Sequence, residues 1–450
     1  MNVARLNFSH GSHDYHRSNI ERVRRLADEM DANVAIMVDT KGPEIRTGLN
    51  EGHKPICLFN GEQVSVTTKP IASTADCISI SYQELPQEVH AGLVIYIDDG
   101  LIALTVEQVE GDTIHCVVTN DGVLGERKGV NVPNVVLGLP AVTEQDRADI
   151  KFSCEVGADA IAASFVRDAE AVRTIRELCA SYGCPNMTII SKIESSLAID
   201  NFDEILAESD GIMFARGDLG IEIPPAEVPH VQKSIIQKCN ASFKPVITAT
   251  QMLDSMTRNP RPTCAEVTDV ANAIDDGTDC VMLSGETAAG AYPVESVRMM
   301  AEICRQTESH LPTRHTYHDV DELKDVSNAA SFGAIEMAKH VGAVALVCPT
   351  LSGLTARILA SMRPQHPILA ASPLERTVHA TCFYWGVTGI LMAMQDGLAQ
   401  TCYTAIRVAR RSGYVKTDDL VIITAGDPVT SPLTHDSETS TNVCMIAQVF

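Results

Sequence analysis

The chain has 450 residues, of which 45% are hydrophobic, and carries a formal net charge of −23. That length accommodates about three domains with cores of their own. A strongly acidic chain repels phosphate backbones and anionic lipids, so the charge argues against a nucleic-acid or membrane-surface role. The sequence contains no apolar run long enough to span a bilayer and no signal segment at its start, which favours a cytoplasmic protein.

Fourteen cysteines are scattered along the chain without CxxC pairs, often inside apolar segments such as residues 279–281. This spacing favours reduced core thiols over disulfides or zinc ligands. It agrees with a cytoplasmic location.

The chain opens in a predicted strand, residues 2–8, followed by a helix over 14–30 and a second strand over 34–38. Polar clusters follow both strands, at residues 9–12 and 39–46. The carboxyl ends of parallel strands share one face of a sheet, so we expect these clusters to meet there.

Residues 45–139 have a different sequence pattern. Their β-branched segments are short and are separated by Asp99-Gly100 and Glu110-Gly111-Asp112, which are typical of hairpin turns. The pattern predicts a small β-barrel domain inserted between a strand and the helix that should follow it. Its position at the carboxyl end of that strand makes it a candidate lid, hinged near residues 42–43 and 139–140.

Strand and helix alternate again from Thr143, where residues 143–146 have the spacing of a helix capping box. Further strands are predicted over 160–165, 188–191, 212–215, 245–250 and 280–284, with helices between them and a last helix over 294–308. Strict alternation with polar residues after nearly every strand favours a (β/α)8 TIM barrel over an open sheet. Only seven units are present, so we expect the first βα unit to be missing from a barrel made of residues 1–44 and 140–310.

Two apolar runs within residues 188–220 each end in a charged cluster, Lys192-Ile193-Glu194 and Arg216-Gly217-Asp218. On a barrel these clusters place a lysine and two acids in one site. Two carboxylates suit Mg²⁺, which keeps its other positions for water and substrate phosphates. A lysine supplies fixed positive charge to a transferring phosphoryl group. In the alternative interpretation Lys192 and Glu194 form only a surface ion pair.

Residues 310–325 are polar and read as a linker to a second α/β domain, residues 326–450. Hydroxyl groups and a glycine precede a predicted helix there, at Thr350, Ser352, Gly353 and Thr355. Such a loop is a plausible phosphate cradle. An ordinary helix start capped by Ser or Thr is the alternative.

Seven segments together resemble the pyruvate kinase family: NVARLNFSHG, DTKGPEIRTG, SKIE, ARGDLG, TATQMLDSM, NPRPT and MLSGET. They stand in order, each at or just after a predicted barrel strand. The likeness is dense up to about residue 310 and looser beyond it. It implies an enzyme that transfers the phosphoryl group of phosphoenolpyruvate to ADP, giving pyruvate and ATP, and that assembles as a homotetramer.

The resemblance assigns roles to individual residues. Lys192 would neutralise charge on the phosphoryl group, Arg5 would bind phosphate, and Thr250 would lie near the enolate as it is protonated. The residues placed against the substrate, in part through their backbone, are Arg5, Lys192, Ala215, Arg216, Gly217, Asp218 and Thr250. In the alternative interpretation Arg5 forms only an ion pair at a strand end, and Thr250 is a core hydroxyl.

The resemblance also implies two ion sites. Glu194 and Asp218 would hold Mg²⁺ or Mn²⁺. The expected ligands of K⁺ are Asn7, Ser9, Asp39 and Thr40. Ligation by oxygen alone suits a hard cation. Glu44, within KGPEIR, resembles the form of the family that depends on K⁺.

Nucleotide is expected to contact Asn7, His10 and Arg46. Gln145 stands where many relatives carry a lysine that reaches nucleotide phosphate, so this chain should bind ADP more weakly. The loop at Thr350, Ser352 and Thr355 resembles the family's effector site and would take a phosphorylated sugar or nucleotide. Asp436 and Glu438, in the final loop, would repel phosphate there.

Two other functions remain open at this point. A non-catalytic regulatory or binding subunit of the same family would explain the missing first unit. A lyase or mutase acting on phosphoenolpyruvate would share the barrel, but it leaves the lid and the monovalent-cation residues unexplained.

Overall fold

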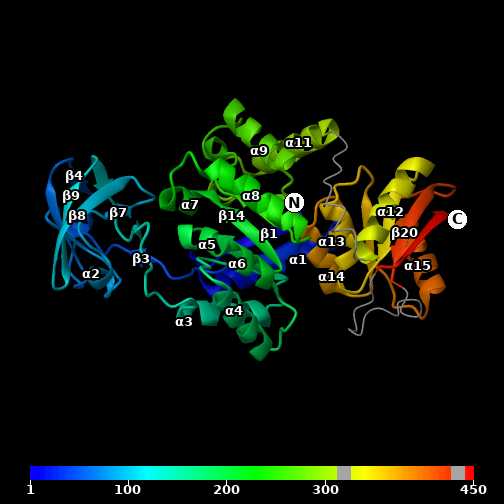
Figure 1. Cartoon of the computed structure of the whole chain (residues 1–450), viewed down its shortest axis with the longest axis horizontal. Helices are drawn as coiled ribbons and strands as arrows, with labels where there is room; N and C mark the ends of the chain where they lie inside the picture. Colours follow the sequence, from blue (N-terminus) through cyan, green and yellow to red (C-terminus); the bar gives the residue numbers. More distant parts are fainter. Residues whose placement is uncertain (312–325, 427–440) are drawn as a thin grey trace.

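The structure is a computed structural model, which describes residues 1–311, 326–426 and 441–450. Three bodies lie in a row along the long axis: the inserted β domain, the barrel domain and the C-terminal α/β domain (Figure 1). Within the described ranges, no helix combines the length and the apolar character that a membrane span requires. The predicted fold class, an α/β barrel with an inserted β lid and a C-terminal α/β domain, is confirmed.

The barrel sheet is entirely parallel, and each strand pairs with the next one along the chain. Its order is β1 (Val3–Asn7), β2 (Ala35–Asp39), β12 (Ala160–Ala163), β13 (Thr188–Ile193), β14 (Gly211–Ala215), β15 (Val246–Ala249) and β16 (Cys280–Val281). Most of these strands are completely buried, as expected for a parallel sheet covered on both faces. The described part of the chain therefore has the seven strands that the sequence predicts, and β1 and β16 do not pair with each other there.

Helices follow the strands of this sheet, and the longer ones cover its outside. They are α1 (His13–Glu29), α3 (Glu144–Glu155), α4 (Ala169–Ser181), α5 (Ser196–Asp200), α6 (Phe202–Glu208), α7 (Arg216–Glu222), α8 (Val228–Ala241), α9 (Cys264–Asp276), α10 (Gly285–Ala288) and α11 (Pro293–His310), with a 3-10 turn at Asp254–Thr257. The predicted capping box is present, since Thr143 accepts the backbone N–H of Asp146 and the Asp146 carboxylate accepts that of Thr143. The predicted linker is wrong at its first residue, because His310 still belongs to α11; residues 312–325 lie outside the described residues.

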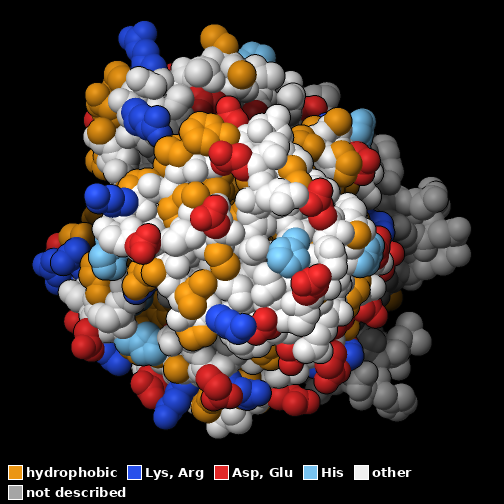
Figure 2. Space-filling view, turned by 90° about the vertical axis from the view of Figure 1, so that its left-hand side faces the viewer, with side chains coloured by type: hydrophobic (Ala, Val, Ile, Leu, Met, Phe, Trp, Pro, Cys, Tyr) orange, Lys and Arg blue, Asp and Glu red, His pale blue; other side chains and the backbone are white. Residues whose placement is uncertain are grey.

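The inserted domain consists of β3 (Ile45–Arg46), β4 (Ile56–Leu58), β5 (Gln63–Thr67), β6 (Cys77–Ser79), β7 (Val94–Ile97), β8 (Ile102–Glu110), β9 (Thr113–Val118), β10 (Gly122–Leu124) and β11 (Gly129–Asn131), with a 3-10 turn at Glu51–His53 and a short helix α2 (Leu85–Glu88). Hairpins β7–β8 and β8–β9 confirm the predicted turns. A bridge between Thr47 and Ile80 joins the ends of the edge strands β3 and β6, so the sheet closes on itself. The end of the molecule formed by this domain carries acidic, basic and apolar side chains intermixed (Figure 2).

The C-terminal domain alternates helix and strand as predicted. Its elements are α12 (Val326–Val341), β17 (Ala345–Pro349), α13 (Leu354–Ser361), β18 (Ile368–Ser372), α14 (Glu375–Ala380), a 3-10 turn at Thr381–Phe383, β19 (Val387–Leu391), α15 (Leu398–Arg411), β20 (Leu420–Ala425) and β21 (Val443–Gln448). The sheet order is β19-β18-β17-β20-β21, and only β21 is antiparallel.

Residues that directly precede barrel strands hold this domain in place. Asp159, before β12, lies 2.8 Å from Nδ1 of His379, and Asp279, before β16, lies 2.7 Å from Arg363. The C-terminal domain therefore packs against the amino ends of the barrel strands. The carboxyl ends face the inserted domain and remain available for a site (Figure 1).

Candidate active site

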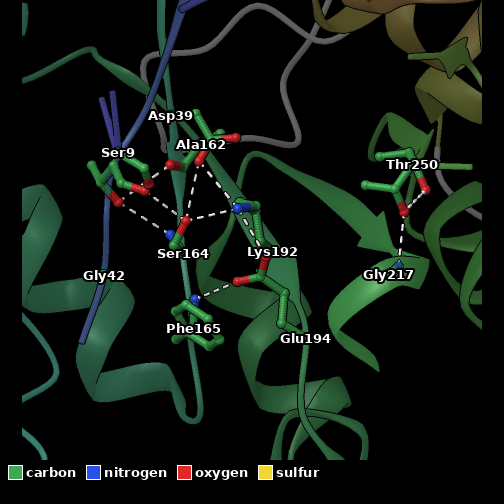
Figure 3. Close-up of polar contacts among 12 residues, drawn as sticks. Ser9, Asp39, Gly42, Ala162, Ser164, Phe165, Lys192, Glu194, Gly217 and Thr250 are labelled. Carbon is green, nitrogen blue, oxygen red and sulfur yellow. Dashed lines mark hydrogen bonds and ion pairs between the residues drawn. The ribbon is translucent and has the colours of Figure 1, made fainter. Parts of the chain in front are cut away.

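Lys192 and Glu194 form the centre of the polar cluster at the carboxyl ends of the strands (Figure 3). They are two residues apart at the end of β13, so their side chains point to the same side. The Lys192 Nζ lies 2.8 Å from the Glu194 Oε1, and both residues are buried. Burial alone would lower the pKa of Lys192, but the charges of Asp39 and Glu194 outweigh it and hold that pKa above its ordinary value. The lysine is therefore a fixed cation.

Asp39, at the end of β2, lies between two cations. Its Oδ1 is 3.1 Å from the Lys192 Nζ, and its Oδ2 accepts a 2.6 Å hydrogen bond from the Arg5 Nε. Burial would raise the pKa of Asp39, but the charges of Lys192 and Arg5 overcome it and lower the pKa. The strand β1 thus brings Arg5 to the same site.

Ser164 and Phe165 belong to the site, and the predicted site residues did not include them. The Ser164 Oγ accepts a 2.7 Å hydrogen bond from the Lys192 Nζ, and the Phe165 N–H donates to the Glu194 Oε2 at 2.7 Å (Figure 3). Both residues directly follow β12, so the rule that polar groups follow barrel strands could have found Ser164. Gly42, at φ +71°, packs against them so closely that a Cβ would lie 2.8 Å from the Phe165 ring. Only glycine fits at that position.

Asp218 approaches Glu194 from the first turn of α7. Burial, together with the nearby Glu194 charge, raises the pKa of Asp218 to about 7. Among the described residues, no group of three His, Cys, Asp or Glu side chains is placed to hold a metal ion. Two adjacent carboxyl groups are nevertheless sufficient for Mg²⁺, which takes only one or two protein carboxylates. The predicted pair therefore fits that ion.

Thr250 links β15 to the start of α7. Its Oγ1 accepts a 2.8 Å hydrogen bond from the Gly217 N–H and donates to the Ala249 carbonyl at 2.7 Å (Figure 3). The backbone from Ala215 to Asp218, which the resemblance places against substrate, therefore lies beside this hydroxyl. The side chain of Arg216 donates to the Asp269 carboxylate at 2.8 Å.

The four expected K⁺ ligands lie at the ends of two neighbouring strands. Asn7 is the register partner of Asp39, and its Oδ1 accepts a 3.0 Å hydrogen bond from the Ser9 N–H. The Thr40 Oγ1 accepts the Ser164 N–H at 3.2 Å. Their oxygen atoms suit a hard cation, although the side-chain oxygens of Asn7, Asp39 and Thr40 already have partners within the protein.

The expected nucleotide contacts are more dispersed. The His10 side chain is exposed, and its carbonyl group lies 2.7 Å from the His16 Nε2. Arg46 pairs with Glu44 at 2.7 Å at the base of the inserted domain. A cavity of about 340 Å³ adjoins the His10 loop and is lined by Phe8, Gly11, Ser12, His13, Asp14, His16, Gln145 and Asp149. The Gln145 Nε2 donates to the Asp149 Oδ1 at 2.8 Å.

The expected effector residues surround the start of α13. Thr350 accepts the N–H of Gly353 at 2.9 Å, and Ser352 accepts the N–H of Leu354 at 3.4 Å. Both hydroxyls thus organise their own loop, as in the alternative interpretation. The Thr355 Oγ1 lies 2.5 Å from the Thr441 Oγ1. Asp436 and Glu438 lie outside the described residues.

Comparison with known proteins identifies the family of this chain. Family models for the pyruvate kinase barrel domain and the pyruvate kinase alpha/beta domain match residues 1–297 and 328–447. The chain is 45% identical to pyruvate kinase from Clostridium acetobutylicum, over 95% of this chain and 91% of that protein. It is 47% identical to pyruvate kinase from Geobacillus stearothermophilus, over 95% and 74%.

A solved structure matches the whole chain. It is a pyruvate kinase from Cryptosporidium parvum, 38% identical, with a TM-score of 0.91 over 100% of this chain and 91% of the other. The chain belongs to the pyruvate kinase family and is a phosphotransferase with the activity of that family.

Proposed function

We propose that this chain binds phosphoenolpyruvate and ADP in the polar cluster and moves the phosphoryl group between them, giving pyruvate and ATP. The observation that carries this assignment is the convergence of Lys192, Glu194 and Asp218 at the carboxyl ends of the barrel strands. Phosphoryl transfer needs positioning and fixed cations more than covalent help, and this site consists of such groups.

Lys192 and Arg5 bind the phosphoryl donor. Lys192 holds its charge at all physiological pH values because Asp39 and Glu194 surround it. Arg5 is oriented by its bond to Asp39 and remains partly exposed, with 19% of its side chain accessible. The two cations stabilise the negative charge that spreads over the phosphoryl oxygens during transfer.

Glu194 and Asp218 hold Mg²⁺ or Mn²⁺, which supplies positive charge to the phosphoryl oxygens when bound. Glu194 is fixed by Lys192 and by the Phe165 N–H, so it offers a rigid first ligand. The closeness of Asp218 to the Glu194 charge supports a shared ion, because two adjacent carboxylates need either a proton or a cation between them.

Thr250 lies where the enolate of pyruvate is protonated. Its hydroxyl stands beside the Gly217 N–H, at the part of the backbone that receives the substrate. Asn7, Ser9, Asp39 and Thr40 hold K⁺ beside Arg5 and Lys192. Nucleotide binds along Asn7, His10 and Arg46, with the adjoining cavity available to it.

Further parts of the proposal concern the whole protein. The chain acts in the cytoplasm as a homotetramer, and its cysteines are all free, which agrees with a reducing compartment. A phosphorylated sugar or nucleotide binds at Thr350, Ser352 and Thr355 and changes activity. Velocity curves that no such compound alters would remove the effector site from the proposal.

A coupled lactate dehydrogenase assay tests the proposed function. With phosphoenolpyruvate, ADP, Mg²⁺ and K⁺, pyruvate should appear at a rate that depends on all four. Absence of turnover, with phosphoenolpyruvate still bound, would instead support a regulatory subunit. Consumption of phosphoenolpyruvate without ADP would support a lyase or mutase.

A further inference from the structure

Arg216 joins the backbone of Thr250 to a carboxylate on a different element. Its Nη2 and Nε donate to the Thr250 carbonyl at 2.7 and 3.2 Å. Its Nη1 lies 2.8 and 2.6 Å from the two carboxylate oxygens of Asp269, on α9. Arg216 is only 8% exposed, whereas the Asp269 side chain is 37% exposed, so the guanidinium is buried and its acid reaches it from the surface.

The carbonyl that Arg216 binds belongs to an unfavourable stretch of backbone. Thr250 has a φ of +66° and Gln251 a φ of +55°. A residue other than glycine rarely adopts this left-handed region, and a β-branched residue such as Thr250 is strained there. Such a conformation persists only when its surroundings hold it, and the arginine supplies two hydrogen bonds at that point.

The same conformation orients the Thr250 hydroxyl. Oγ1 accepts the Gly217 N–H while the carbonyl on the same residue is held by Arg216. If the carbonyl were released, the peptide could relax toward an ordinary φ and carry the hydroxyl away. The position of the hydroxyl therefore depends on the arginine.

We propose that Asp269 is a positioning residue for the protonation step, acting through Arg216 on Thr250. The inference rests on the proposed function, in which Thr250 lies beside the enolate. The Asp269 carboxylate balances the charge of the buried guanidinium and holds its Nη1 by two charge-assisted bonds. Without that partner Arg216 is a buried cation with no acid, and it turns toward water.

Asp269→Ala is the first test, and Asp276→Ala is its matched control. Both acids lie on α9, but Asp276 pairs with Lys233 instead of Arg216. Asp269→Ala should lower kcat by about 10- to 100-fold, as small misplacements of reacting groups do, with the KM for ADP unchanged. Asp269→Asn, which keeps one acceptor, should give an intermediate loss and serves if the alanine variant does not fold. Asp276→Ala should keep kcat within about twofold.

A double-mutant cycle separates positioning from a general structural effect. Thr250→Val removes the hydroxyl and keeps the shape. If Asp269 acts through Thr250, the double variant Asp269→Asn/Thr250→Val should have nearly the same kcat as Thr250→Val alone. Exchange of the pyruvate methyl protons with D2O, followed by proton NMR, should fall in parallel with kcat, since it reports the proton step directly.

The two ideas fail in different ways. If the wild-type chain does not turn over phosphoenolpyruvate and ADP, the proposed function fails. If the wild-type chain is active, two results would show that Asp269 does not position Thr250. One is that the kcat losses of Asp269→Asn and Thr250→Val multiply in the double variant, and the other is that Asp276→Ala loses as much kcat as Asp269→Ala.

Discussion

The ammonium group of Lys192 meets the carboxylate of Glu194 at 2.8 Å, two residues further along the same strand end. Because both side chains are buried, removal of Lys192 would leave Glu194 as a buried carboxylate without its cation. Asp39 and Ser164 hold the ammonium group from the other side. The ammonium and carboxylate groups are therefore preorganised as fixed opposite charges in a site shielded from water.

Replacement of Lys192 by methionine should abolish most activity. The variant removes the cation that faces the phosphoryl group and leaves Asp39 and Glu194 without it, so we expect kcat to fall by about 100- to 1,000-fold or more. Lys233→Met, at a half-exposed ion pair on α8, should leave kcat nearly unchanged. A Lys192→Met enzyme that keeps a tenth of wild-type kcat would contradict the assigned role.

Asp218→Asn should weaken divalent metal binding. This effect can be measured by thermal unfolding, without an activity assay. Mn²⁺ raises the melting temperature of a protein that binds it in the folded state, and the variant should lose most of that rise. Asp203→Asn is a suitable control, because Asp203 is an exposed acid paired with Lys238. Equal Mn²⁺-dependent shifts in the wild type and Asp218→Asn would show that the ion binds elsewhere.

The sequence predicted correctly that residues at the ends of the barrel strands lie close together. Arg5, Asp39, Lys192 and Glu194 all lie in or directly after barrel strands, and strand direction alone brings them to one face. The seven strands and their order follow from the same alternation. These parts depend on local pattern and chain direction, which are readable without coordinates.

Contacts that depend on tertiary packing were not predictable. Asp269 lies inside a helix whose sequence shows only an apolar face, and nothing there indicates a bond to Arg216. The left-handed backbone at Thr250 runs against the preference of threonine. Both features exist because neighbouring elements impose them.

Gln145→Lys should strengthen ADP binding. The glutamine lies at the cavity beside the His10 loop, and an ammonium group there would add attraction for phosphate. We expect the KM for ADP to fall by about tenfold or less, with the KM for phosphoenolpyruvate unchanged, because Asp149 neutralises part of the new charge. An unchanged affinity for ADP would refute the explanation of this departure from the family.

The contact between His379 and Asp159 should make stability depend on pH. The hydrogen bond to Asp159 raises the pKa of His379 above its ordinary 6.5, and burial opposes it. A histidine whose pKa is raised in the folded state contributes its full stabilisation of that state below its ordinary pKa. The stabilisation is lost as the pH rises through the raised pKa.

The melting temperature of His379→Gln measured across that range tests this contact. The deficit of the variant relative to the wild type should be largest below pH 6.5 and should shrink as the pH rises. A deficit that stays constant from acid to alkaline pH would mean that the charge of His379 does not stabilise the contact between the domains.

Anomalous X-ray diffraction from crystals grown with Mn²⁺ and phosphoenolpyruvate tests the central claim most directly. We expect a single strong peak within coordination distance of both Glu194 and Asp218, with the phosphoryl group between that ion and the Lys192 ammonium. A peak bound by only one of the two acids, or a phosphoryl group out of reach of Lys192, would contradict the account.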